Sequence, residues 1–149
     1  MSQEPIDSPT GWVARHVKSY AESGGARGHH FHGAPTLLIT TIGRRSGLPR
    51  RTALIYGRDG DRYLVVASNG GADDHPLWFH NLLTQPRIKV QVGAEVFDAV
   101  AHPAAEDERP RLWETMTGLW PHYTGYQRKT SRRIPIVIIE RAATPDLDR

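Results

Sequence analysis

The residues of this sequence with the clearest chemical potential are four arginines, a serine and two glycines within nine consecutive residues, 43–51. The arginines are Arg44, Arg45, Arg50 and Arg51. A guanidinium group matches the paired oxygens of a phosphate or carboxylate and keeps its charge when buried. Glycines let the backbone N–H groups of a turn approach an anion. No lysine follows the second glycine as in a Walker loop. The composition therefore leaves two interpretations equally open, an anion-binding turn and a solvated basic turn.

A second group of basic residues lies near the C-terminus and consists of Arg128, Lys129, Arg132 and Arg133. The whole chain is nearly neutral, with 19 lysines and arginines against 16 acidic residues and a net charge of +3. Two local clusters in such a chain suit a small anionic ligand better than a long polyanion. No recognised nucleic-acid-binding motif accompanies them, so we expect no nucleic-acid partner.

Uncharged groups that could bind a flat ligand occur in two further segments. Ser68-Asn69-Gly70-Gly71 follows an apolar run, and its glycines permit the backbone to lie against a ring while Ser68 supplies a hydroxyl. The start of the next helix adds Trp78 and Asn81. A tryptophan is more often a core residue than a stacking platform, whereas a buried amide needs hydrogen-bond partners.

Candidate catalytic groups are few. Tyr123 and Tyr126 are spaced for one helical face and could donate a proton, or could be lid residues whose hydroxyls meet solvent. The sequence has no Ser/His/Asp pattern, no paired carboxylates and no cysteine, which excludes thiolate catalysis and cysteine-ligated metals. A bound redox cofactor fits this shortage because it brings its own reactivity.

Three histidines, His29, His30 and His32, stand in a glycine-rich segment. Metal ligands are usually fixed on regular elements with supporting hydrogen bonds, which glycines do not provide. We therefore predict a solvated loop over residues 23–33 and no metal site.

The elements that must position these groups follow from hydrophobic periodicity. At 149 residues the chain fits a single domain, residues 1–149, with flexible tails at 1–8 and 142–149. Strands are predicted at 35–42, 51–58, 62–67, 87–92, 95–101 and 134–140. Helices are predicted at 9–22, 76–85, 104–120 and 122–129, the second capped by an aspartate at 73–74 and the third opening on the acidic residues 106–108. Antiparallel hairpins with inserted helices describe a small barrel, and the absence of a βαβ repeat argues against a parallel sheet.

The N-terminus lacks the pattern of a secretory signal, and no apolar stretch is long enough to cross a bilayer. We therefore expect a cytoplasmic protein. The apolar stripe of the N-terminal helix could cover the core or touch a membrane surface, and covering the core is the expected role. Peripheral contact with the inner face of the cell membrane is the alternative.

Three segments together resemble the deazaflavin-dependent nitroreductase family of actinobacteria. In order they are TTIGRRSGLPRRTAL, ASNGGADDHPLWFHNL and YTGYQRKTSRRIPIVIIE, and the resemblance covers roughly residues 12–141. It implies a split β-barrel of the FMN-binding-protein type, an α+β fold that is mainly β, with helices covering the barrel ends. It also implies an oxidoreductase that binds the deazaflavin coenzyme F420 and transfers hydride from the reduced form to a quinone, a nitroaromatic or another activated acceptor.

The resemblance assigns roles by position. The anionic tail of the coenzyme is expected at Arg44, Arg45, Ser46, Arg50, Arg51 and Thr52. The ring and ribityl chain are expected against Val66, Ala67, Ser68 and Asn69, with Gly70 and Gly71 allowing close approach, and against Leu77, Trp78, Phe79, His80 and Asn81. Tyr123 and Tyr126 form the aromatic lid, and the catalytic groups that orient or protonate the acceptor are Tyr123, Tyr126 and Ser68.

Two positions on the substrate side depart from the family pattern. Trp120 and Ile55 stand where the best-known members carry aromatic hydroxyls. This change favours a flat apolar acceptor such as a quinone and leaves the reduction of nitroimidazoles open. Two alternative functions use the same barrel, a non-catalytic carrier of a lipid or tetrapyrrole-like ligand and an FMN-dependent oxidoreductase. The intact arginine turn argues against the carrier, and a monomer and a homodimer both remain open.

Overall fold

The structure is a computed structural model and describes residues 6–7, 11–26, 30–31 and 33–142. Its strands are β1 (Ile6–Asp7), β2 (His30–Phe31), β3 (Ala34–Ile42), β4 (Pro49–Ile55), β5 (Gly57–Asp59), β6 (Arg62–Val66), β7 (Arg87–Val92), β8 (Glu95–Pro103) and β9 (Ile136–Arg141). Its helices are α1 (Gly11–Ser23), α2 (Leu77–Thr84), α3 (Arg109–Leu119) and α4 (His122–Arg128), with a short 3-10 turn η1 (Asn69–Gly71).

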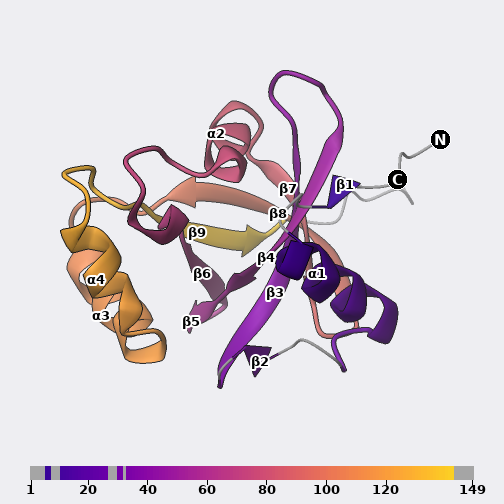
Figure 1. Cartoon of the computed structure of the whole chain (residues 1–149), viewed down its shortest axis with the longest axis horizontal. Helices are drawn as coiled ribbons and strands as arrows, with labels where there is room; N and C mark the ends of the chain where they lie inside the picture. Colours follow the sequence, from indigo (N-terminus) through magenta and orange to yellow (C-terminus); the bar gives the residue numbers. More distant parts are fainter. Residues whose placement is uncertain (1–5, 8–10, 27–29, 32, 143–149) are drawn as a thin grey trace, which may run out of the picture.

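The strands form one curled sheet in the order β1-β4-β3-β7-β8-β9-β6-β5, with β2 paired to β3. Every pairing is antiparallel except that of β1 with β4. The longest hairpin is β3–β4, whose tip projects from the rest of the molecule beside α2 (Figure 1). This is the split barrel predicted from the sequence, which is thereby confirmed.

The inside of the barrel is filled by alternate residues of the strands, as a period of two requires. Val65, Val90 and Ile139 are fully buried there, and Tyr63 and Phe97 pack ring against ring with centroids 5.7 Å apart. Helix α2 closes one end of the barrel, because Phe79 and Leu82 belong to the same cluster.

Two helical layers cover the outer faces of the sheet. Helix α1 packs through Val17 and Tyr20 against Leu38 of β3, and helices α3 and α4 lie together on the opposite side of the molecule (Figure 1). They cover β6 and β9 through Leu112, Met116 and Tyr123. The described residues include no helix long and apolar enough to cross a membrane, and no group of three side chains in this part of the chain could hold a metal ion.

Several local predictions need correction. Helix α3 begins at Arg109 rather than at 104, because the acidic residues 106–108 form a turn before it. No aspartate caps α2; the preceding residue is Pro76, and Asp73 instead accepts a hydrogen bond from Thr130 (2.9 Å).

The predicted tails and the glycine-rich loop lie largely outside the described residues. Within the N-terminal tail, however, Ile6–Asp7 pairs with β4, and within the C-terminal tail the N–H of Ala142 donates to the carbonyl of Asp98. Of the histidine-rich segment, residues 27–29 and 32 lie outside the description, while His30–Phe31 forms β2.

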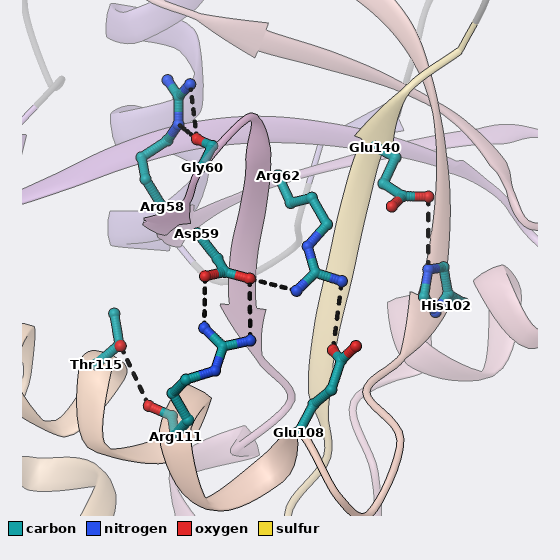
Figure 2. A network of polar contacts seen from close by, with 9 residues as sticks. All are labelled: Arg58, Asp59, Gly60, Arg62, His102, Glu108, Arg111, Thr115 and Glu140. Atoms are coloured by element: carbon teal, nitrogen blue, oxygen red, sulfur yellow. Dashed lines mark hydrogen bonds and ion pairs between the residues drawn. The ribbon is translucent and has the colours of Figure 1, made fainter.

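A network of charges ties the β5–β6 hairpin to the start of α3 (Figure 2). The Asp59 carboxylate accepts hydrogen bonds from Arg62 and from Arg111, whose Nη1 lies 2.6 Å from Oδ1. Arg62 also pairs with Glu108 (3.3 Å). Hydrogen bonds from Arg111 and then Arg62 lower the pKa of Asp59 from its usual value of 3.8 to about 2. The network therefore contributes to stability only while Asp59 is ionised.

The substitution Asp59→Asn is expected to destabilise the protein at neutral pH and to have little effect near pH 2. A carboxylate with a lowered pKa contributes stability that is present above its unfolded pKa and is lost as pH falls through the folded value. Thermal unfolding of the two proteins between pH 2 and pH 7 measures this. The exposed Asp61 on the same turn provides the control Asp61→Asn. A stability difference between wild type and Asp59→Asn that did not change with pH would contradict the prediction.

Candidate functional site

The site is a pocket of about 300 Å³ between strand β4 and helix α4. Its lining residues come from both halves of the barrel: Thr36, Ala53, Leu54, Ile55, Val66, Ser68, Gly70, Trp120, Tyr123 and Tyr126. The walls are mainly apolar, with hydroxyls at Thr36, Ser68 and the two tyrosines. A cavity of this volume, apolar with a few polar groups, is typical of small-ligand sites.

The aromatic wall of the pocket comes from the junction of α3 and α4. Trp120 ends α3, Pro121 precedes α4, and Tyr123 and Tyr126 follow within α4 with ring centroids 6.1 Å apart. Tyr123 is 5% exposed, and its hydroxyl has no hydrogen-bond partner among the described residues. Because no fully buried side-chain polar atom of these residues lacks a partner, this hydroxyl must reach the surface of the pocket that Tyr123 lines. Burial, and secondarily the neighbouring Tyr126, raises the pKa of Tyr123. Its hydroxyl is thus a protonated donor available to a ligand.

The floor of the pocket is the turn after β6. Ser68 is helical in conformation (φ −76°, ψ −36°), and Asn69 and Gly70 follow with φ of 48° and 64°. A right-handed residue followed by a left-handed one turns successive N–H groups to one side, which is an arrangement that binds anions and carbonyl oxygens. The Asn69 amide stabilises its own conformation by donating to the carbonyl of Asp74 (3.0 Å).

The two glycines of this turn differ in their surroundings. No atom lies within 4 Å of the position that a side chain would take at Gly70, which faces the pocket. At Gly71 the same position lies 2.7 Å from the carbonyl oxygen of Tyr126. Gly71 therefore lets α4 approach the turn, and not the coenzyme ring as predicted from the sequence.

The arginine turn joins β3 to β4 and is closed by its own hydrogen bonds. The N–H of Gly43 donates to the carbonyl of Leu48 (2.8 Å), and the N–H of Gly47 to that of Gly43 (2.8 Å). Ser46 Oγ accepts from the N–H of Leu48 (3.1 Å). A side chain at Gly43 would meet Ser46 Oγ at 2.6 Å, so glycine is required there for the serine to close the turn.

Asn81 fixes this turn to helix α2. Its Oδ1 accepts from the N–H of Arg44 (3.0 Å), and its Nδ2 donates to Thr41 Oγ1 (3.2 Å). Asn81 is 6% exposed, so its amide has the partners that a buried amide needs. The predicted site residue therefore positions the turn from within the protein.

The side chains of Arg44, Arg45 and Arg50 point away from the core and are exposed. None of the three forms an ion pair with a residue that the structure describes. Three neighbouring cations without acidic partners are available to an anionic ligand.

Strand β4 connects the arginine turn to the pocket. Arg50 and Arg51 lie near its start, and Ile55 at its end lines the pocket. Five positions along a strand span about 17 Å. The structure thus places a cationic group and an apolar pocket at the two ends of one strand, as an elongated ligand with a flat head and an anionic tail requires.

Other predicted site residues are distributed differently. Val66 lines the pocket, whereas Ala67 and Phe79 belong to the barrel core. On α2, Leu77 is 74% exposed and His80 is half-buried. Trp78 packs against the core and Thr52 is half-buried on β4.

The second basic cluster does not form one site. Arg133 pairs with Glu106 (2.8 Å), and Arg132 is hydrogen-bonded to backbone carbonyls. Arg128 and Lys129 line a separate open groove on α4, which shares Tyr126 with the pocket.

Three lining residues were missed from the sequence. Thr36, Ala53 and Leu54 stand in the middle of predicted strands, where their types suggest only a sheet. The one available signal was their position on the hairpin that carries the arginine turn.

Comparison with known proteins agrees with this geometry. A sequence model of the F420H(2)-dependent quinone reductase family matches residues 12–141. An F420H(2)-dependent quinone reductase of Mycobacterium tuberculosis (strain ATCC 25618 / H37Rv) is 39% identical over 143 residues, which cover 87% of this chain and 96% of the relative.

Two solved structures are also similar to this chain. One described as a domain-swapped dimer has a TM-score of 0.69 and 34% identity, covering 89% of this chain and all of its own. An F420-H2 dependent reductase (FDR-A) has a TM-score of 0.66 and 37% identity, covering 71% of this chain and 94% of its own. The family resemblance noted from the three motifs is thereby confirmed, and this chain belongs to the F420H(2)-dependent quinone reductase family.

Proposed function

We propose that this protein transfers hydride from reduced coenzyme F420 to a quinone held in the pocket between β4 and α4. The observation that carries the proposal is the placement of an apolar pocket and three unpaired exposed arginines at opposite ends of β4. When bound, the reduced coenzyme supplies the hydride. The residues of the chain bind it, orient the acceptor and exclude water.

The pocket residues fit the ring of the coenzyme. Gly70 leaves space beside the Ser68–Gly71 turn, and Val66 with Ile55 provides apolar surface. The N–H groups of that turn suit the carbonyl oxygens of a deazaflavin. Ser68 adds a hydroxyl on the same wall.

The arginine turn fits the anionic tail. Arg44, Arg45 and Arg50 are exposed without acidic partners among the described residues, and Arg51 and Thr52 follow on β4. Ser46 Oγ accepts a hydrogen bond within the turn and keeps its own hydrogen for a phosphate oxygen. Phosphate and carboxylate groups are the anions that such donors bind best.

Addition of hydride to a quinone leaves negative charge on an oxygen, which one proton then neutralises. Tyr123 carries a protonated hydroxyl at the pocket wall with no partner among the described residues, and Tyr126 and Ser68 line the same pocket. Ile55 and Trp120 complete an acceptor side without further hydroxyls, which favours a flat apolar acceptor.

The substitution Tyr123→Phe is expected to lower kcat about tenfold, the effect of one lost hydrogen bond of about 1.4 kcal/mol to a developing charge. The dissociation constant of F420 should change little. Steady-state kinetics with menadione as acceptor measure kcat, and fluorescence titration measures the dissociation constant of F420. The variant Tyr126→Phe identifies which hydroxyl acts, and an unchanged kcat in both would remove the tyrosines from the mechanism.

Titration with F420 and, separately, with FMN tests the proposed function itself. Quenching of F420 fluorescence with saturation, followed by oxidation of F420H2 only when a quinone is present, is the expected result. If the protein instead retained FMN through purification and bound no F420, the proposal would be wrong and the protein would be an FMN-dependent enzyme. Binding of an apolar ligand without either coenzyme would indicate a carrier.

Two further features belong to the proposal. A homodimer is supported by the structural neighbour described as a domain-swapped dimer. Peripheral membrane contact through α1 is supported by the position of this helix on the outside of the sheet, where Val17, Tyr20 and Ala21 form its contact with β3 among the side chains that the structure describes. Sedimentation with phosphatidylglycerol vesicles checks the membrane contact.

A further inference from the structure

Arg132 makes an unusual set of contacts in the segment between α4 and β9. Its Nε donates to the carbonyl of Ala72 (3.0 Å), and its Nη2 to that of Ser68 (2.8 Å). Its Nη1 donates to the carbonyl of Ala67 (3.1 Å) and to Nδ1 of His75 (2.9 Å). One guanidinium group thus binds four acceptors on the single stretch 67–75.

That stretch contains the floor of the pocket. Ser68 and Gly70 line the pocket, and Asn69 holds a left-handed conformation that non-glycine residues seldom adopt. Among the described residues, the turn has few backbone hydrogen bonds of its own. The main ones run from the N–H of Gly71 to the carbonyl of Ser68 (2.9 Å) and from the N–H of Ala72 to the carbonyl of Asn69 (3.1 Å). Such a turn needs bonds from outside to keep one conformation.

Arg132 is itself held in place from both sides. Its N–H donates to Thr130 Oγ1 (3.1 Å), and Thr130 donates to Asp73 on the stretch being held (2.9 Å). Its carbonyl accepts from Nε2 of Gln127 in α4 (2.7 Å). The guanidinium therefore joins the floor of the pocket to the helix that carries the aromatic wall.

We propose that Arg132 is a positioning residue, which holds the turn after β6 in the conformation that receives the coenzyme ring. This inference rests on the proposed function of the pocket. Arg132 makes no contact with the coenzyme in this role, because its donors are directed at Ala67, Ser68, Ala72 and His75. Lysine cannot replace it, since a single ammonium cannot reach four acceptors in a planar arrangement.

The bond to His75 makes the arrangement sensitive to acid. Arginine has no acceptor, so Nδ1 of His75 must be unprotonated to receive its hydrogen bond. Burial, and then the charges of Arg132 and His80, lower the pKa of His75, while Asp74 opposes them. Asp73 also faces Arg132 from this stretch, and Phe79 packs against the His75 ring (4.7 Å). If His75 were protonated, its Nδ1–H and the Nη1–H of Arg132 would both be donors, and the hydrogen bond between the two side chains would be lost.

The test compares Arg132→Met and Arg132→Lys with the neighbouring control Arg133→Met, whose side chain has an exposed ion pair. Without the Arg132 hydrogen bonds, we expect the turn to have its binding conformation in about one tenth of the coenzyme-free molecules. The F420 dissociation constant would then rise about tenfold. Once F420H2 is saturating, kcat should stay within about twofold, since bound coenzyme restores the turn. Amide hydrogen exchange over residues 67–75 should accelerate in the coenzyme-free variants and stay unchanged in the control.

A pH series adds a readout that a purely structural role would not move. As pH falls below about 6.5, the ordinary histidine value, F420 should bind progressively less tightly to wild type than to His75→Asn. The asparagine offers an acceptor oxygen that does not titrate. Titration of the coenzyme affects both proteins equally and cancels in the ratio of the two dissociation constants.

The outcomes separate this inference from the proposed function. Unchanged exchange over 67–75 in Arg132→Met, or faster exchange with an unchanged dissociation constant, would overturn the positioning role while wild-type binding of F420 still upheld the function. A wild type that binds no F420 would overturn the function, and the exchange comparison would then still show whether Arg132 holds the turn. If the ratio of the F420 dissociation constants of wild type and His75→Asn stayed constant across pH, His75 would have no part in holding the turn.

Discussion

Replacing Arg44 and Arg50 together by alanine is expected to weaken the binding of F420 about 100-fold. A hydrogen bond to a charged group contributes about 1.5–3 kcal/mol, and the lower end applies here because both side chains are exposed. Two such losses amount to about 3 kcal/mol, or about two powers of ten in the dissociation constant. The fold should be unaffected, since neither side chain pairs with a described residue.

Fluorescence titration at two salt concentrations measures this effect and its electrostatic origin. Wild-type affinity should fall as salt rises, and the double variant should depend on salt less steeply. Arg58→Ala removes another exposed arginine, which lies on β5 beyond the far end of β4 from the turn, and serves as the control. If the double variant bound F420 as tightly as the wild type does, the arginine turn would be only a solvated hairpin.

The substitution Gly71→Ala is expected to destabilise the protein and to displace the aromatic wall of the pocket. The backbone at Gly71 has φ of +85°, which costs a residue with a side chain about 1–2 kcal/mol. The new carbon would also lie 2.7 Å from the carbonyl oxygen and 3.0 Å from Cα of Tyr126. Backbone cannot yield as a side chain can, so α4 must shift, which adds about 1–3 kcal/mol.

The control for this substitution is Gly60→Ala in the β5–β6 turn. Gly60 has φ of +61° and no atom within 4 Å of the added carbon, so only the conformational cost of about 1–2 kcal/mol applies. Urea unfolding should show the larger loss for Gly71→Ala, together with a raised KM for quinone because Tyr123 and Tyr126 move with α4. Equal destabilisation in the two variants, with unchanged KM, would contradict the role assigned to Gly71.

The pocket depends on contacts between segments that are distant in the chain. Asn81 of α2 orients the arginine turn, Gly71 admits α4, and Arg132 holds the turn after β6. Each lies outside the reach of local patterns, because its partner is at least 37 residues away. These residues explain how a barrel with few catalytic groups can present one ordered pocket.

The sequence by itself determined the barrel and its basic turn. Period-two patterns and turn residues place β3, β6, β7 and β8 within a few residues of their observed bounds, because burial of alternate side chains is a local property of a strand. The cluster at 43–51 was visible as charge density, and the order of three motifs indicated the family. Acidic residues misled the prediction of helix starts, since Asp73 and Glu106 have partners elsewhere in the fold.

The tertiary structure alone decided which of these groups are free to bind a ligand. Arg132 and Arg44 have the same side chain, and the sequence placed both in basic clusters. Folding brings four backbone and imidazole acceptors to Arg132 and leaves the guanidinium of Arg44 exposed without an acidic partner among the described residues. A hydrogen-bonding group is available to a ligand only when the folded chain does not already satisfy it, and that depends on residues brought together from across the sequence.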